Sequence, residues 1–375
     1  MKKIVFAVYH DCNFEARSHE LLECCTKMGE VHFVSYAAPY DMPDVQTYLI
    51  DKRKSLALLE FLKTVKQVLK KVKPDIVLLH DNDCAVLIPF VKKHLPGAKL
   101  VYDSSELYIK EGTDRKRVVG HDGWKIRIKQ ILTSFRPRYE KKYLKYADVV
   151  VAANIERATI MQKYFGLSRI PLVFDNVHRI DVAYDSEACD RTYGHAFYDN
   201  AFHVLFAGGI HEERKTFDYI RAFASLNREE YRLVIVGTAS EVSRRRYEAM
   251  LAELELQNVV YLGLVPRENL RYLMQKSQGS VVIFDTDSYN TKYCASGKCY
   301  ESLFEGVPIL ASENPPLKRL CEQEGIGVSN DDYAAAIVEL KENYSFYKAK
   351  VADYVMRLDY ESRVDTLKSQ IEELI

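Results

Sequence analysis

A glycine pair followed by two basic residues marks the second half of the chain. The apolar run 204–207 ends at Gly208-Gly209, and Arg214 and Lys215 follow a few positions later, just before a helical pattern. A strand, a glycine loop and a helix N-terminus together bring backbone N–H groups close to a phosphate. The loop is therefore a candidate diphosphate site. The alternative is a plain strand-to-helix turn with a solvated basic pair.

A second set of polar side chains opens a predicted helix at Ser296. Ser296 can cap that helix, and the helix N-terminus together with Lys298 attracts an anion. Glu301 lies one turn beyond Lys298 on the same face, and a carboxylate there suits a pair of ribose hydroxyls. The alternative is a surface ion pair between Lys298 and Glu301.

Polar side chains also end two predicted strands of the first half. His80-Asp81 closes the run 75–80, and Asp103 and Glu106 follow the run 99–102. Ligands of parallel α/β sheets bind outside the carboxyl ends of the strands, so we expect these side chains on the rim of the site. The alternative is that His80 caps a strand end and Asp81 caps a helix.

The elements that position these residues alternate along the chain. Predicted strands are 4–8, 31–35, 75–80, 99–102 and 148–152, then 204–207, 232–236, 259–262, 280–284 and 308–311, and amphipathic helices are clearest at 15–28 and 58–72. Nearly unalternating apolar strands between helices indicate parallel sheets covered on both faces. We therefore expect an α/β fold with two doubly wound domains.

The alternation of predicted strands and helices is interrupted at 181–200. This stretch is polar and without periodicity, so we place an interdomain linker there. The expected domains are 1–180 and 201–352. Two domains that face each other would put the site in the cleft between them.

Composition excludes several classes of protein. The 375 residues carry 53 basic and 53 acidic side chains, which argues against a nucleic-acid partner and against disorder. The eight cysteines form no Cys-x-x-Cys pair, so we expect free thiols in a reducing cytosol rather than a zinc cage. The opening MKKIVFAVYH predicts a first strand rather than a signal peptide.

Several stretches resemble one enzyme family. SGKCYESLFEGVPILAS at 296–312 resembles the signature of the retaining family 4 of nucleotide-sugar glycosyltransferases, which have two facing Rossmann-like domains, the GT-B fold. VLFAGGIHEERKTFDYIRAF at 204–223 is similar to the donor-phosphate strand, loop and helix of that family. RLVIVGTASE resembles part of its nucleotide region. In the first half, DIVLLHDNDCAVLIP, LVYDSSELY and NFEARSHELLECCTKMG resemble the acceptor side more loosely.

The resemblance implies transfer of a sugar from a nucleoside-diphosphate sugar to an acceptor hydroxyl, with retention, of the kind used in bacterial surface polysaccharide synthesis. The acceptor would be a glycan or a lipid-linked saccharide. His80, Asp81 and Glu106 would orient or deprotonate its hydroxyl, and Arg17 and Asp103 would also lie on the acceptor side.

On the donor side, the nucleoside diphosphate leaves with negative charge. The backbone N–H groups of Gly208 and Gly209, the side chains of Arg214, Lys215 and Lys298, and the helix N-terminus would stabilise that charge. We expect no obligatory cofactor or metal. Asp285-Thr286-Asp287 matches the Asp-x-Asp pattern of a metal-binding pair. In the GT-B fold, however, it lies at the expected position of the loop that contacts the sugar.

The sequence departs from the family at three places. Tyr293 stands where family 4 enzymes often carry a glutamate, Gly209 where many carry an arginine, and Tyr9-His10-Asp11-Cys12 replaces a frequent glycine pair. Two rivals therefore stay open: a sugar-nucleotide epimerase on the same plan, and a catalytically silent sugar-nucleotide binding partner.

Residues 115–145 carry eleven basic against two acidic side chains, with Trp124, Ile128, Ile131, Leu132 and Phe135 interleaved. Such a stretch can lie on an anionic membrane, so we expect a cytoplasmic protein with peripheral contact at the inner face of the plasma membrane. A solvated helical face is the alternative.

The segment 353–375 carries an apolar stripe of Val355, Leu358, Val364, Leu367 and Ile371. By resemblance, it forms a helix that crosses back to pack on the N-terminal domain.

Overall fold

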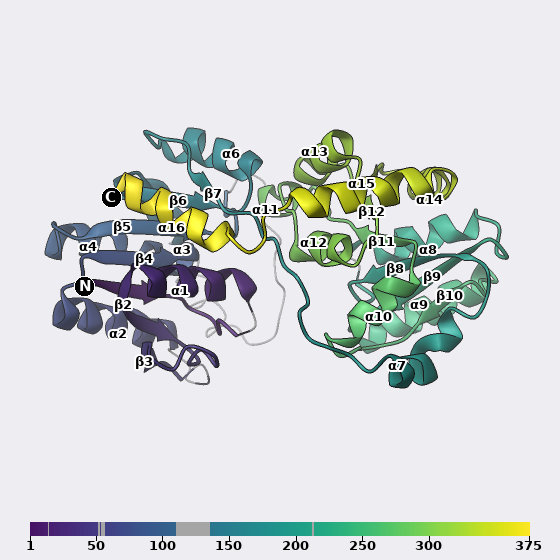
Figure 1. Ribbon diagram of the computed structural model, residues 1–375, viewed down its shortest axis with the longest axis horizontal. Coiled ribbons are helices and arrows are strands. Elements are labelled where there is room, and N and C mark those ends of the chain that lie inside the picture. The colour runs from purple at the N-terminus through teal and green to yellow at the C-terminus, as the bar shows by residue number, and fades with distance from the viewer. Residues whose placement is uncertain (14, 52, 54–56, 110–135, 212–213) are drawn as a thin grey trace. The chain divides into compact units, whose positions relative to one another are not determined.

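The computed structural model describes residues 1–13, 15–51, 53, 57–109, 136–211 and 214–375. The chain divides into two compact units, the first formed by 1–175 with 360–375 and the second by 176–359 (Figure 1). Each unit is a parallel sheet with helices packed against it, as the alternating apolar segments predict.

In the first unit the strand order is β3-β2-β1-β4-β5-β6-β7, and all neighbours are parallel. The strands are β1 (Lys2–Ala7), β2 (Gly29–Ser35), β3 (Gln46–Leu49), β4 (Ile76–His80), β5 (Lys99–Ser104), β6 (Val149–Ala152) and β7 (Leu172–Val173). The helices are α1 (Ala16–Met28), α2 (Ala57–Val72), α3 (Asp81–Ala85), α4 (Ile88–His94), α6 (Ile155–Phe165) and α16 (Arg363–Leu374), with the 3₁₀ turn η1 (Leu144–Tyr146). Strand order reverses between β1 and β4, the point where doubly wound sheets bind ligands.

The second unit repeats this plan with the order β10-β9-β8-β11-β12-β13, again parallel throughout. Its strands are β8 (Phe202–Ala207), β9 (Tyr231–Val236), β10 (Val259–Tyr261), β11 (Gly279–Val282), β12 (Ile309–Ala311) and β13 (Gly327–Ser329). Its helices are α7 (Ser186–Tyr193), α8 (Thr216–Ala224), α9 (Glu241–Glu253), α10 (Asn269–Lys276), α11 (Tyr289–Lys292), α12 (Gly297–Phe304), α13 (Pro315–Glu324), α14 (Tyr333–Glu342) and α15 (Tyr344–Arg357), with the 3₁₀ turn η2 (Gly194–Ala196). The reversal here lies between β8 and β11.

The central strands are mostly buried, because helices cover both faces of each sheet. Every residue of β4 and of β8 is buried. This explains why apolar runs predicted these strands well, whereas the partly exposed edge strand β3 and the short β7 and β13 lacked such a run.

Residues 181–200 do not form the linker that we expected, because they belong to the second unit and carry α7 and η2. Asp185 caps α7 through the backbone N–H of Ala188, at 3.0 Å. Cys189 and Ala196 pack into the same apolar cluster as Leu205. A short amphipathic helix of eight residues with a cap offered too little periodicity to be recognised. The chain instead passes between the units at 175–176 and 359–360.

The closing segment is broken rather than continuous. α15 ends at Arg357 in the second unit, and α16 begins at Arg363 in the first. Val364, Leu367 and Ile371 of α16 join the apolar cluster that contains residues of α1, and the two helices lie side by side (Figure 1). The last three residues of the predicted stripe therefore pack on the first unit. Within the described ranges, no helix combines the length and apolarity needed to cross a bilayer.

Candidate active site

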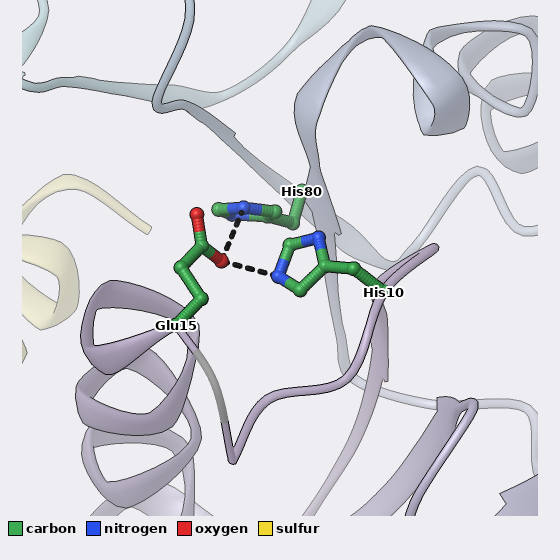
Figure 2. Close-up of side chains that lie close together, drawn as sticks. All are labelled: His10, Glu15 and His80. Carbon is green, nitrogen blue, oxygen red and sulfur yellow. Dashed lines mark ion pairs between the residues drawn. The ribbon is translucent and has the colours of Figure 1, made fainter. Parts of the chain in front are cut away.

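Two histidines and a glutamate meet where the strand order of the first unit reverses. His10 lies beyond the end of β1, His80 ends β4, and Glu15 immediately precedes α1. Figure 2 shows the Glu15 carboxylate directed at both imidazole rings. Glu15 Oε2 pairs with His10 Nε2 and lies 3.4 Å from His80 Nε2. The adjacency of β1 and β4 makes this meeting possible, because the carboxyl ends of parallel neighbours lie at one edge of the sheet.

His80 is enclosed by carboxylates on both sides of its ring. Its Nδ1 lies 2.7 Å from Asp103 Oδ2, and its Nε2 lies 3.3 Å from Asp81 Oδ2. Burial alone would lower the pKa of His80, but the charges of Asp81 and Glu15 and the hydrogen bond to Asp103 raise it well above the ordinary value. The same proximity to His80 and His10 lowers the pKa of Glu15, against the effect of its own burial.

Arg17 and Asp103 are brought together as predicted, but not where an acceptor would meet them. Their side chains are 2% and 0% exposed, so they face each other inside the unit. Burial raises the pKa of Asp103, but Arg17 and His80 outweigh that effect and lower it. Arg17 also donates to the carbonyl of Phe174. The pair therefore lies next to His80 inside the unit, and the acceptor-side assignment of Arg17 and Asp103 stays a prediction in which they would act by positioning His80.

Asp81 ties the ends of two neighbouring strands together. It has a positive φ of 58°, and its carboxylate accepts hydrogen bonds from Ser105 N at 2.8 Å and Ser105 Oγ at 2.7 Å. Its bonds therefore run to the loop after β5, rather than to the start of α3. The exposed Glu106 accepts from the hydroxyl of Tyr108, so its carboxylate is not part of the His80 cluster.

Reasoning from the sequence did not identify His10 and Glu15 as site residues. One signal was available, because His10 lies in the segment that replaces the family's glycine pair after the first strand. Its pairing with Glu15 and His80 depends on strand order, which no local pattern specifies.

The second unit has its own cluster at the equivalent reversal, between β8 and β11. A small pocket of about 20 Å³ is lined there by Gly208, Arg214, Ser296 and Lys298, together with the ends of both strands. Lys298 donates to the carbonyl of Ala207, the last residue of β8. Burial and the neighbouring Arg214 lower the pKa of Lys298, and Glu301 opposes that shift. Four of the residues predicted to bind the sugar donor therefore line the same pocket.

The glycine pair works differently from the prediction. The N–H groups of Gly208 and Gly209 both donate to the carbonyl of Val236, at 3.1 and 2.8 Å, so they are engaged within the unit. Gly209 has a φ of +75°, and a Cβ there would lie 2.1 Å from the carbonyl oxygen of Thr238. The glycines thus allow the loops after β8 and β9 to approach closely, and the expectation of amides directed at a phosphate is wrong for this conformation.

The remaining donor candidates lie around this pocket. Ser296 occupies the N-cap position of α12, but its side chain makes no capping hydrogen bond to the described residues. Glu301 lies on α12 and accepts from Arg267 Nη2 at 3.3 Å, so it does not pair with Lys298 as the simple alternative proposed. Lys215 precedes α8 and, in the described part of the chain, is absent from the pocket lining.

Comparison with known proteins identifies the second unit. Residues 201–343 match the family model described as glycosyl transferases group 1. The matched stretch lies within the second unit. The pocket at Lys298 and the Gly208-Gly209 loop both lie within this matched stretch. No curated protein sequence matches the chain.

Solved structures show the class of fold over the whole chain. Sucrose-phosphate synthase from Thermosynechococcus elongatus has a TM-score of 0.74 at 14% identity, covering 100% of this chain and 99% of that one. HepE from Anabaena, in complex with UDP-glucose, has a TM-score of 0.70 at 14% identity, with the same coverage. WaaG, a glycosyltransferase involved in lipopolysaccharide biosynthesis, has a TM-score of 0.67 at 15% identity, covering 98% and 99%. The chain therefore has the GT-B class of fold, with one parallel sheet in each unit.

Two sequence predictions concern other parts of the chain. Of the basic segment 115–145, residues 115–135 lie outside the described residues, including Trp124, Ile128, Ile131, Leu132 and Phe135. In Asp285-Thr286-Asp287, one oxygen of Asp285 accepts from Thr291 Oγ1 at 2.7 Å and from the N–H of Asp287 at 3.2 Å. Asp285 therefore stabilises the turn that leads into α11.

Proposed function

We propose that the protein transfers a sugar from a nucleoside-diphosphate sugar to an acceptor hydroxyl. The observation that carries this proposal is the convergence of Lys298, Arg214 and Gly208 at the strand reversal of the second unit, within the matched stretch. Two cations there can stabilise the charge that develops on the departing diphosphate. UDP-glucose is the first donor to test, because HepE binds it on the same fold.

The acceptor side of the proposal rests on the cluster of the first unit. The Asp81 side chain is 17% exposed and Glu106 is exposed, so these two carboxylates are available to orient an acceptor hydroxyl. His80 has no exposed surface, so it acts through Asp81 and Glu15 as a positioning residue. This arrangement supports orientation of the hydroxyl more directly than proton abstraction by His80 itself.

We further propose a retaining, family 4-like reaction that serves polysaccharide or glycolipid assembly at the cytoplasmic face of the membrane. The resemblance of 296–312 to the family signature supports retention. WaaG, with its stated role in lipopolysaccharide biosynthesis, supports a saccharide or lipid-linked acceptor. Peripheral membrane contact through 115–145 stays a prediction from the sequence.

The test combines binding and turnover. Calorimetry should detect UDP binding, and Lys298→Ala should weaken it by about 10- to 150-fold, since a hydrogen bond to a charged group contributes roughly 1.5–3 kcal/mol. Lys292→Ala, on the short helix α11, is the matched control and should bind UDP like the unmodified protein. Unchanged affinity in a folded Lys298→Ala protein would contradict the donor assignment.

Product analysis with UDP-glucose and a saccharide acceptor then separates the activities. A new glycoside with the donor's anomeric configuration supports the proposal. Release of an epimerised sugar without transfer would identify an epimerase. UDP-glucose binding without turnover across a panel of saccharide and lipid-linked acceptors would identify a binding partner.

A further inference from the structure

We propose that His10, Glu15 and His80 bind one divalent transition-metal ion, with Zn²⁺ as the best fit. Each residue offers one ligand atom, and these atoms all lie within 4.8 Å of one another; Nε2 of His10 and Nε2 of His80 both pair with Glu15 Oε2 (Figure 2). Two imidazoles and one carboxylate form a ligand set that suits Zn²⁺ and leaves one coordination position open. This inference goes beyond the proposed transfer reaction, for which the sequence predicted no obligatory metal.

The distance between His80 and Glu15 fits a tetrahedral ion, whereas the contact between Glu15 and His10 is shorter than such an ion requires. Zn²⁺ binds nitrogen and oxygen ligands at about 2.0–2.2 Å, which places tetrahedral ligand atoms about 3.3–3.5 Å apart. His80 Nε2 lies 3.4 Å from Glu15 Oε2 and 3.3 Å from Asp81 Oδ2. Glu15 Oε2 and His10 Nε2 form a direct ion pair, so one of these two side chains must move outward to admit the ion. Asp81 lies beside the open position.

The surroundings of His80 are those of a metal ligand. A ligating histidine usually donates its second ring N–H to a carboxylate, which holds the tautomer and the ring orientation. Here, His80 Nδ1 lies 2.7 Å from the fully buried Asp103, and Arg17 Nε holds the same Asp103 oxygen at 3.0 Å. With Nδ1 facing Asp103, Nε2 is the ring atom of His80 on the side of Glu15, and a metal ion would bind there in exchange for the Nε2 proton.

The solvent exposure of the three side chains also fits a metal site. The side chains of His10 and Glu15 are 31% and 35% exposed, so an ion can enter from solvent, while the 0% exposed His80 forms the base of the site. The ligands come from the end of β4 and from the loop between β1 and α1, so an ion would join these segments. A carboxylate that bridges two imidazoles without a metal is the competing explanation, and the experiment separates the two.

Metal binding is measured on the whole chain without sugar nucleotide. After treatment with chelator and dialysis, Zn²⁺ calorimetry should give one tight site per chain. Co²⁺ should give a visible absorption spectrum of four-coordinate nitrogen and oxygen ligation. Zn²⁺ should displace the Co²⁺. A spectrum with strong thiolate charge transfer would place the ion on cysteine and overturn the proposal.

Ligand variants make the assignment specific. His10→Ala and Glu15→Gln should each weaken Zn²⁺ binding by more than the 10- to 100-fold that loss of an outer-shell partner causes. His19→Ala is the matched control, because His19 lies on α1 and pairs with Asp41 at 2.7 Å, outside the cluster. It should bind Zn²⁺ normally. Unchanged binding in a folded His10→Ala protein would overturn the proposal.

The same measurements keep the two proposals apart. UDP affinity depends on Lys298 in the second unit, whereas Zn²⁺ affinity depends on His10 and Glu15 in the first. Absence of stoichiometric Zn²⁺ binding in a protein that still binds UDP would therefore refute the metal site and leave the transferase proposal intact.

Discussion

Arg17 and Asp103, 86 positions apart in the chain, form a fully buried ion pair with Nη2–Oδ1 at 2.5 Å and Nε–Oδ2 at 3.0 Å. It joins the first turn of α1 to the end of β5, next to His80. Since Asp103 also meets His80, the pair connects the framework of the first unit to its candidate site.

Breaking this pair should destabilise the first unit strongly. Arg17→Met removes one of the two partners of the buried Asp103 charge, the other being His80, and loss of a partner from a buried pair costs about 3–5 kcal/mol of unfolding free energy. Arg245→Met is the control, because Arg245 and Glu241 are about three-quarters exposed and such pairs contribute roughly 0–1 kcal/mol. Urea titration followed by circular dichroism measures both. Equal losses for the two variants would show that the Arg17 pair contributes little.

The structure separates the two basic residues of the glycine loop. Arg214 lines the pocket beside Lys298, so Arg214→Ala should weaken UDP binding by about 10-fold or more. Lys215 has a positive φ of 52°, and Asn tolerates that conformation, so Lys215→Asn tests its charge with little backbone strain. We expect near-normal UDP affinity for Lys215→Asn by calorimetry. If Lys215→Asn weakened UDP binding more than Arg214→Ala, the diphosphate would lie beside Lys215 instead.

Glu301 should distinguish a nucleotide from a bare diphosphate. If its carboxylate holds the ribose, Glu301→Gln weakens UDP binding by about 10-fold and leaves pyrophosphate binding unchanged. Arg267→Ala removes the described partner of Glu301 and serves as a control for indirect effects. Equal losses for both ligands in Glu301→Gln would assign the residue to the phosphate region.

Glu140 should make stability depend on pH. Burial, and to a smaller degree the charge of Asp81, raise its pKa from 4.5 to about 8, although the hydroxyl of Tyr102 donates to it at 2.8 Å. Between these values the folded chain keeps a proton that the unfolded chain releases. The unfolding free energy should therefore fall as pH rises from about 4.5 to about 8.

Denaturant titrations at several pH values check this expectation. Glu140→Gln keeps a neutral, hydrogen-bonding side chain, so its unfolding free energy should fall less over the same range, with a difference on the order of a few kcal/mol. Parallel pH profiles of the two proteins would show that Glu140 titrates normally.

The basic segment 115–145 should bind anionic vesicles. Each cation close to such a surface contributes about 1 kcal/mol, screened by salt. Co-sedimentation should therefore be strong at low salt, weak at high salt, and lost when Lys125, Arg127 and Lys129 become glutamate. Absence of binding at low salt would leave a soluble acceptor as the simpler expectation.

Some of these features were readable from the sequence alone. Buried parallel strands need continuous apolar residues, so runs such as 75–80 and 204–207 predicted strands and placed His80 and Gly208 at their carboxyl ends. The signature at 296–312 is local in the chain, and it pointed to Lys298 in a region that the group 1 family model also matches.

Tertiary structure decided which of these residues meet. Parallel sheets pair strands that are distant in sequence, so only the order β2-β1-β4-β5 brings His10, Glu15, His80 and Asp103 together. Burial then decided the pairing, because a charged side chain without solvent must have a partner, and Arg17 therefore pairs with Asp103 inside the unit. Likewise, the close approach of the loops after β8 and β9 engaged the N–H groups of Gly208 and Gly209, since buried backbone donors take the nearest acceptor. Composition and periodicity are properties of single segments, whereas a site depends on the distances between them.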